Sequence, residues 1–66
     1  MFVDRTIYFI VSKERPIMFH AGNGELSDDF AEAFQYESYE RAYLDLDTFD
    51  EPDKFEVIKG RVVVNL

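Results

Sequence analysis

Two segments near opposite ends of the chain have the apolar pattern of β-strands, and only one segment between them has that of a helix. In residues 5–12, β-branched and aromatic side chains alternate, with Ile7, Phe9 and Val11 on one side. Residues 55–64 predict a second long strand. A chain of 66 residues has room for one domain built from these elements, so the pattern indicates a small α+β fold.

The polar residues 13–16 include a proline and predict a turn. Residues 17–20 then resume an extended pattern, so residues 5–20 are expected to form a β-hairpin. Gly22, Asn23 and Gly24 end it, since they tolerate positive φ.

Residues 25–36 allow two interpretations. Ser27 with the two aspartates after it is a potential cap for a short helix that carries Phe30 and Phe34. Alternatively, an acidic loop leads into a short strand at residues 33–36. We favour the loop and strand, because a clearer helix begins directly afterwards.

That helix is predicted to start at Ser38, a suitable N-cap, and to end near residue 49 or 50, shortly before Pro52. Five apolar residues recur at helical spacing and are expected to face the core: Tyr39, Ala42, Tyr43, Leu46 and Phe49. In the last strand, Gly60 predicts a bulge. Apolar residues on both faces near Val63 suggest a strand that is central or covered by a second subunit. The expected order is ββ(β)αβ, a small antiparallel sheet with one helix packed on one face, in a single domain.

The chain contains no cysteine, seven Phe and four Tyr. Disulfides, thiolate metal sites and cysteine nucleophiles are therefore excluded. A domain of this size has a small core, which aromatic residues strengthen because each buries a large area. Self-association is a further source of stability, and we expect a homodimer with Val62, Val63 and Val64 at its interface.

No basic stretch followed by a long apolar run occurs near Met1, and the longest apolar run, residues 7–11, is too short to span a bilayer. We therefore expect a cytoplasmic protein that does not bind membranes.

Negative charge is concentrated in one part of the chain. Residues 25–53 contain eleven acidic side chains and only Arg41 as a base, a net charge of −10, whereas the remaining residues carry +3. Such a field repels nucleic acids and attracts basic surfaces. We therefore expect no direct binding of nucleic acid.

No motif for catalysis, metal or cofactor binding is recognisable. Counted from Asp45, the acidic run places Phe49 and Asp50 where an EF-hand loop needs a ligand and a glycine. His20 is the only histidine and has no evident partner in the sequence, and no serine lies in a nucleophile elbow. We expect a protein that is not an enzyme and holds no cofactor.

The predicted helix instead presents an acidic outer side. Glu40, Leu44, Asp47 and Glu51 follow one another at intervals of three or four residues and are expected to share it. The three acids of this set form, with Asp50 and Asp53, an array of carboxylates that is able to imitate the phosphates of a nucleic acid. Leu44 would serve as an apolar anchor. The alternative is that these acids only keep the protein soluble.

The segment Phe34-Gln-Tyr-Glu-Ser-Tyr-Glu-Arg-Ala42, the closing segment Phe55-Glu-Val-Ile-Lys59 and the compact hairpin resemble small acidic accessory proteins of bacteriophages and prophages in Gram-positive bacteria. Such proteins include inhibitors of host defence, among them anti-CRISPR, anti-restriction and DNA-glycosylase-inhibiting proteins, some of which imitate DNA. The resemblance implies a similar role here, in the cytoplasm of the host cell if a phage encodes the chain, and it assigns no individual residues.

Two functions follow as hypotheses. In the first, the chain is an inhibitor that occupies the basic, nucleic-acid-binding surface of a host defence protein. In the second, it is a structural or regulatory homo-oligomer whose acidic face is only solubilising.

Overall fold

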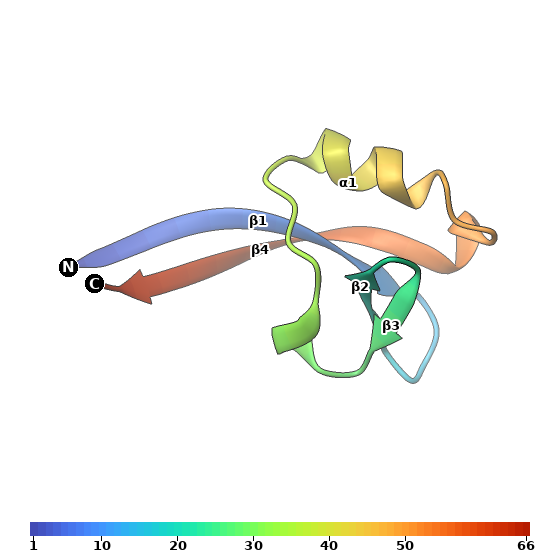
Figure 1. The fold of residues 1–66 in the computed structure, drawn as a ribbon, viewed down its shortest axis with the longest axis horizontal. Helices are drawn as coiled ribbons and strands as arrows, with labels where there is room; N and C mark the ends of the chain where they lie inside the picture. Colours follow the sequence, from blue (N-terminus) through green and yellow to red (C-terminus); the bar gives the residue numbers. More distant parts are fainter.

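The computed structural model describes all 66 residues and shows a four-stranded antiparallel sheet with one α-helix. The sheet has the order β3-β2-β1-β4, and the α+β class predicted from the sequence is confirmed (Figure 1). Its elements are β1 (Phe2–Ser12), β2 (Phe19–Gly22), β3 (Glu25–Ser27), the 3₁₀ helix η1 (Phe30–Glu32), α1 (Tyr39–Leu46), the 3₁₀ helix η2 (Pro52–Lys54) and β4 (Phe55–Asn65).

The two long strands, β1 and β4, pair along their whole length. Their register runs from Phe2 opposite Asn65 to Ser12 opposite Phe55 without interruption. The predicted bulge at Gly60 is therefore wrong. This glycine is needed for a different reason, because an added Cβ would lie 2.7 Å from Cε1 of Phe9, whose ring covers it.

Residues on both faces of β1 are buried, because the strand alternates and each face has its own cover. On one face, Ile7, Phe9 and Val11 pack with Ala33. On the other face, the cluster is made by Ile10 with three residues of the helical side, Tyr36, Ala42 and Leu46. The prediction of one helix on one face is confirmed, and the segment around η1 covers the opposite face.

The hairpin predicted for residues 5–20 forms only in part. β1 pairs with β2 only near Val11 and Phe19, whereas the other edge of β1 pairs with β4. The turn at Gly22, Asn23 and Gly24 has positive φ at all three residues, as predicted, and joins β2 to β3.

Residues 25–36 combine parts of both interpretations. They begin as β3, and Asp29 then caps η1 by accepting a hydrogen bond from the backbone N–H of Ala31 at 2.9 Å. The short strand expected at residues 33–36 is reduced to one bridge, in which Tyr36 pairs with Tyr8 of β1. The segment thus carries Ala33 to one cluster and Tyr36 to the other.

The helix starts as predicted, with the hydroxyl of Ser38 accepting a hydrogen bond from the backbone N–H of Arg41 at 3.2 Å. It ends at Leu46, earlier than expected. The backbone N–H groups of Thr48 and Phe49 bond to carbonyls three residues back, which tightens the chain into a turn. Phe49 is thereby turned toward the sheet and packs against the ring of Phe55.

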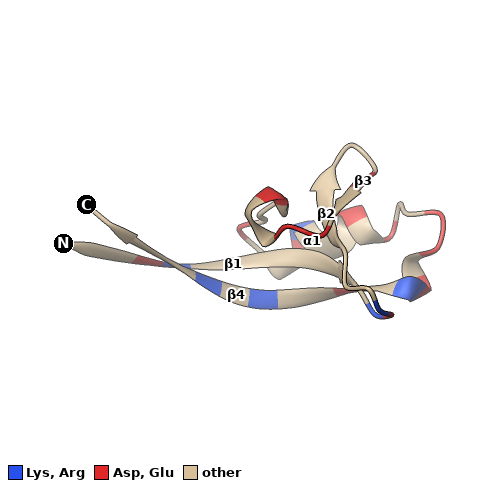
Figure 2. Cartoon of the chain, turned by 90° about the horizontal axis from the view of Figure 1, so that it is seen from below, with Lys and Arg blue, Asp and Glu red and all other residues tan.

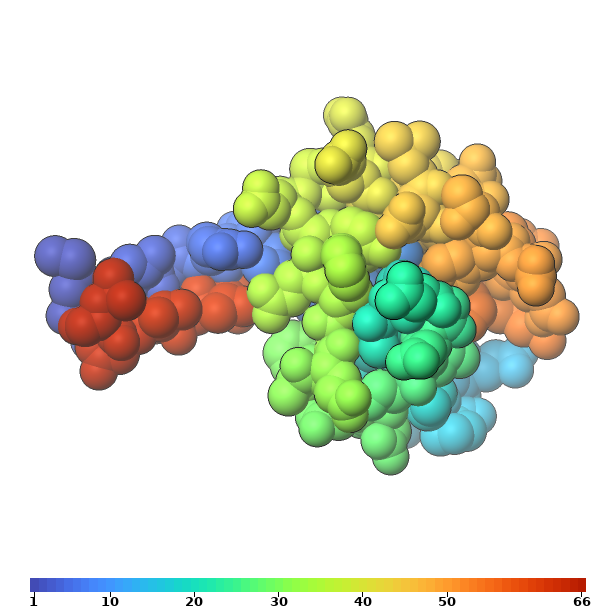
Figure 3. Space-filling model, viewed as in Figure 1, coloured from blue at the N-terminus to red at the C-terminus, as the bar shows by residue number.

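Beyond the helix, β1 and β4 continue as a two-stranded arm, which we define as residues 2–6 and 61–65. Figures 1 and 3 show this arm projecting from the body of the molecule, with both chain ends at its tip. The structure extends over 41 Å along this direction against 24 and 19 Å across it.

Candidate partner-binding site

Most acidic and most basic side chains occupy different regions of the structure. Figure 2 shows the acidic residues on α1, on the loops beside it and around η1, and basic residues along β4 and at the turn between β1 and β2. The charge asymmetry of the sequence is thus a spatial asymmetry.

Of the acidic array predicted on the helix, only part forms a single stripe. Glu40, Leu44 and Asp47 are all exposed and follow one another at helical spacing, with Leu44 64% exposed. Glu51 does not extend this stripe, because α1 has ended five residues earlier. This part of the prediction is wrong.

Asp50, Glu51 and Asp53 instead belong to the turn and the 3₁₀ helix that follow α1, and all three are exposed. The carboxylate of Glu51 lies 2.8 Å from the ammonium group of Lys54. This bond raises the pKa of Lys54. Because both side chains are largely exposed, water weakens the pair, and Glu51 stays accessible to another cation.

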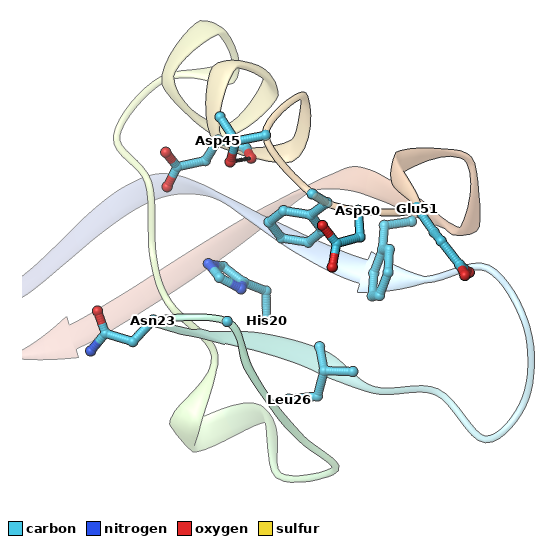
Figure 4. Close-up of a pocket in the computed structure, with 10 residues that line it drawn as sticks. His20, Asn23, Leu26, Asp45, Asp50 and Glu51 are labelled. Carbon is cyan, nitrogen blue, oxygen red and sulfur yellow. Dashed lines mark hydrogen bonds between the residues drawn. The ribbon is translucent and has the colours of Figure 1, made fainter.

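A pocket of about 620 Å³ lies between the helix side and the β2–β3 hairpin, and the sequence did not reveal it (Figure 4). Asp45 comes from α1, Asp50 and Glu51 from the following turn, and His20 from β2. The other lining residues are Asn23, Gly24, Leu26, Thr48, Phe49 and Phe55. The pocket therefore combines three carboxylates with two aromatic rings.

His20 is the buried polar residue of this pocket. Its side chain is 5% exposed, and its Nδ1 has no hydrogen-bond partner. Its ring lies 4.9 Å from that of Phe49 and is stacked on that of Tyr36 at 6.5 Å, between ring centroids. Burial lowers the pKa of His20, while the negative charge of Asp45 raises it and opposes part of that effect. The imidazole is therefore neutral near pH 7.

Asp45 is held by Tyr36, whose hydroxyl donates a hydrogen bond to the carboxylate at 2.5 Å. Burial raises the pKa of Tyr36, and the bond to Asp45 and its charge raise it further. This contact ties the helix to the segment that crosses β1. It leaves the remaining lone pairs of the carboxylate for another donor.

Two helical tyrosines that were predicted to lie in the core are half exposed. Tyr39 and Tyr43 are 51% and 52% exposed, and their rings stack with centroids 6.0 Å apart. Of the expected stripe, Ala42 and Leu46 are buried and Phe49 is partly buried. Together with Glu40 and Leu44, the tyrosines line a shallow hollow of about 260 Å³.

The predicted oligomer residues lie elsewhere, on β4. Val63 and Val64 are 56% and 41% exposed in the arm, and Val62 is partly buried against the Ile7 cluster. The interpretation of this strand as central is wrong, because β4 is an edge strand of the sheet.

The site has the groups needed to bind a cation. No three histidine, aspartate or glutamate side chains are arranged so that they would hold a metal ion.

The pocket could not be predicted from the sequence, because its lining residues are up to 35 positions apart and are brought together by the turn after α1. The run of acids from Asp45 to Glu51 was the one available signal.

Comparisons with family models, curated proteins and solved structures gave no match for this chain. No helix of the structure has the length and apolar character needed to cross a membrane.

Proposed function

We propose that this chain is a protein-binding module whose acidic half occupies a basic, nucleic-acid-binding surface of a partner. The observation that supports it most is the pocket around His20, which is bordered by Asp45, Asp50 and Glu51 and contains the rings of Phe49 and Phe55. In this proposal, an arginine or lysine of the partner enters the pocket, and the exposed acids around it face further cations.

The chemistry of the pocket suits a guanidinium group. Carboxylates accept charge-assisted hydrogen bonds from arginine, and aromatic faces attract the same cation. Lysine would use the same carboxylates with a less specific geometry.

The exposed helix surface extends this site with apolar contacts. Tyr39, Tyr43 and Leu44 are surrounded by acidic residues such as Glu40 and Asp47. Tyrosines are frequent energetic centres of protein interfaces, whereas solubility alone requires no aromatic surface. The combination favours a protein partner over a purely solubilising role for the acids.

The resemblance to phage accessory proteins makes the proposal more specific. In this form, the chain is an inhibitor of a host defence protein, of the anti-CRISPR or anti-restriction type, and its carboxylates take the positions of DNA phosphates. Two consequences are then expected. Binding weakens steeply as the salt concentration rises, and duplex DNA competes with the chain for the partner.

The pocket is tested with a nine-residue arginine peptide in an NMR titration of the isotope-labelled protein. We expect the largest shifts at His20, Asp45 and Phe49. The double variant Asp50→Asn, Glu51→Gln should weaken binding at least fivefold. Its matched control, Asp28→Asn with Glu37→Gln, removes the same charge from exposed positions outside the pocket and should weaken binding less than twofold.

Equal losses in the two double variants would mean that net charge alone attracts the peptide, and the pocket would then have no specific role. The inhibitor form is tested separately on purified DNA-handling proteins of the host. Complex formation that duplex DNA does not reduce would contradict the imitation of DNA.

A further inference from the structure

The outer edge of β4 is a complete, unpaired strand edge. Met1 and Leu66 exchange backbone hydrogen bonds, and the N–H of Lys13 bonds to the carbonyl of Lys54. Because hydrogen-bonded pairs alternate in an antiparallel ladder, the even-numbered residues of β4 bond to β1. The odd-numbered residues from Val57 to Asn65 therefore direct their backbone N–H and C=O groups outward, where no strand of the chain lies.

The side chains of this edge differ between its two faces. On the face of the Ile7 cluster, the even positions from residue 58 are all apolar or glycine: Ile58, Gly60, Val62, Val64 and Leu66. On the opposite face, Lys59 and Arg61 flank Gly60, and Val63 follows. A long strand edge with such an apolar row is a site for pairing with another strand.

The two cations restrict how a second copy of β4 fits. In an antiparallel pair centred on Gly60, Lys59 would face Arg61 of the other copy twice. A pair centred on Arg61 would place two arginines opposite each other. Like charges directly opposite are destabilising, so both registers are disfavoured.

A pair centred on Val62 removes these conflicts. Arg61 then faces Val63, and Lys59 faces Asn65. On the other face, Val62 faces its own counterpart, Val64 faces Gly60, and Ile58 faces Leu66. Of the registers that separate the cations and cover the exposed valines, this one pairs the longest part of β4.

We propose that two copies of this chain pair antiparallel along β4, about a two-fold axis at Val62, and so join their sheets into one. The same edge serves both copies, which closes the assembly as a dimer. Residues 61–63 of each arm then pair with residues 61–63 of the other arm, and residues 64–66 reach residues 58–60 of the partner copy, where the edge of β4 is also free. The backbone groups of the odd-numbered residues and the exposed valines are then covered together.

The absence of cysteine permits a direct test of the register. At the two-fold axis, the Cα atoms of the two Val62 residues would form a non-hydrogen-bonded pair about 4.5 Å apart, within the range that a disulfide bridges. We expect Val62→Cys to form a disulfide-linked dimer under mild oxidation at least tenfold faster than Val64→Cys or Lys59→Cys. Fastest linkage at residue 64, or equal rates at all three positions, would overturn the register.

The association itself is measured by sedimentation velocity of the unmodified chain at protein concentrations between about 1 and 300 µM, because small interfaces bind weakly. We expect a monomer–dimer equilibrium, and we expect Val64→Lys to raise its dissociation constant at least tenfold. The exposed Val3→Lys, in β1 of the arm and opposite Val64, is the matched control and should leave it unchanged. Circular dichroism confirms that each variant is folded.

A chain that stays monomeric over the whole range would overturn the proposal. So would a dimer that Val64→Lys does not weaken. Because Val64 does not line the pocket of His20, Val64→Lys should leave binding of the arginine peptide unchanged, and the two proposals succeed or fail separately.

Discussion

The same two strands, β1 and β4, run through both the body and the arm, but their surroundings differ in the two regions. In the body, Ile7 and Ile10 of β1 are 1% and 0% exposed, because η1 and α1 cover opposite faces of the sheet. In the arm, Phe2 of β1 is 71% exposed and Val63 of β4 is 56% exposed. The backbone ladder continues where the burial of side chains ends.

This difference separates two contributions to the stability of a sheet. Backbone hydrogen bonds alone make a two-stranded ribbon only marginally stable, and packing of an apolar face supplies most of the stability of a sheet. The arm is therefore expected to open more readily than the body. Its exposed valines contribute little to the monomer, so a second role for them, as in the proposed dimer, is reasonable.

Matched truncations in the two regions should have very different effects. Ile10→Ala removes a fully buried side chain between β1 and α1, and we expect a loss of about 2–5 kcal/mol in the free energy of unfolding. A domain of this length has a total of roughly 3–10 kcal/mol, so the variant is near the limit of folding. Phe2→Ala, in the arm, should change the value by about 0.5 kcal/mol or less. Urea denaturation at low protein concentration measures both.

Comparable losses in Ile10→Ala and Phe2→Ala would show that the arm belongs to the same cooperative unit as the body. Hydrogen exchange provides a second view of the comparison. The amides of even-numbered residues in β4 should exchange faster beyond Gly60 than before it.

Gly60 lies where the arm meets the body, and a larger residue there should disturb both. A Cβ at this position would lie 2.7 Å from Cε1 of Phe9, and that ring is held by Phe19 and Phe30 at centroid distances of 6.0 and 5.1 Å. Gly60→Val is therefore expected to cost about 1–3 kcal/mol through overpacking. Thermal denaturation measures it.

The control for Gly60→Val is the double variant with Phe9→Leu, which replaces the ring by a smaller side chain. If the two substitutions were strictly additive, the contact between residue 60 and Phe9 would not be the cause of the loss.

Much of this architecture could be predicted from local sequence patterns. The alternation in residues 5–12, the Ser38 cap and the glycines at 22 and 24 determine elements through short-range physics, and the structure contains each of them. The predictions from the sequence failed at positions where tertiary contacts determine the local structure. At Gly60, the ring of Phe9 takes the place of a bulge, and near Leu46 the packing of Phe49 ends the helix early.

The candidate site was less accessible to sequence reasoning. Asp50 and Glu51 were identified from the density of acids, which is a local signal. The contribution of His20 depends on a contact with Phe49, 29 positions later, and on the fold of the turn between them. No periodic pattern in one sequence reports such a contact. The half-exposed Tyr39 and Tyr43 were misassigned because helical spacing does not indicate how much of the helix surface other elements cover.

The smallest expected effect is a pH dependence that belongs to the body alone. His20 is buried there beside Asp45, whereas the charged pair of the arm, Asp4 and Arg61, is largely exposed. Burial lowers the pKa of His20 below its usual value of 6.5, so the unfolded chain takes up a proton at a higher pH than the folded one. The free energy of unfolding should therefore fall as the pH decreases through 6.5 toward the lowered pKa.

His20→Phe tests this origin, because it keeps an aromatic ring against Phe49 and cannot be protonated. Urea denaturation at pH 7.5 and 5.5 should show a decrease for the unmodified chain and a smaller one for the variant. The negative charge of Asp45 favours the protonated imidazole, which limits the size of the effect. Equal decreases in the two proteins would assign the pH dependence to the acidic residues and not to the buried histidine.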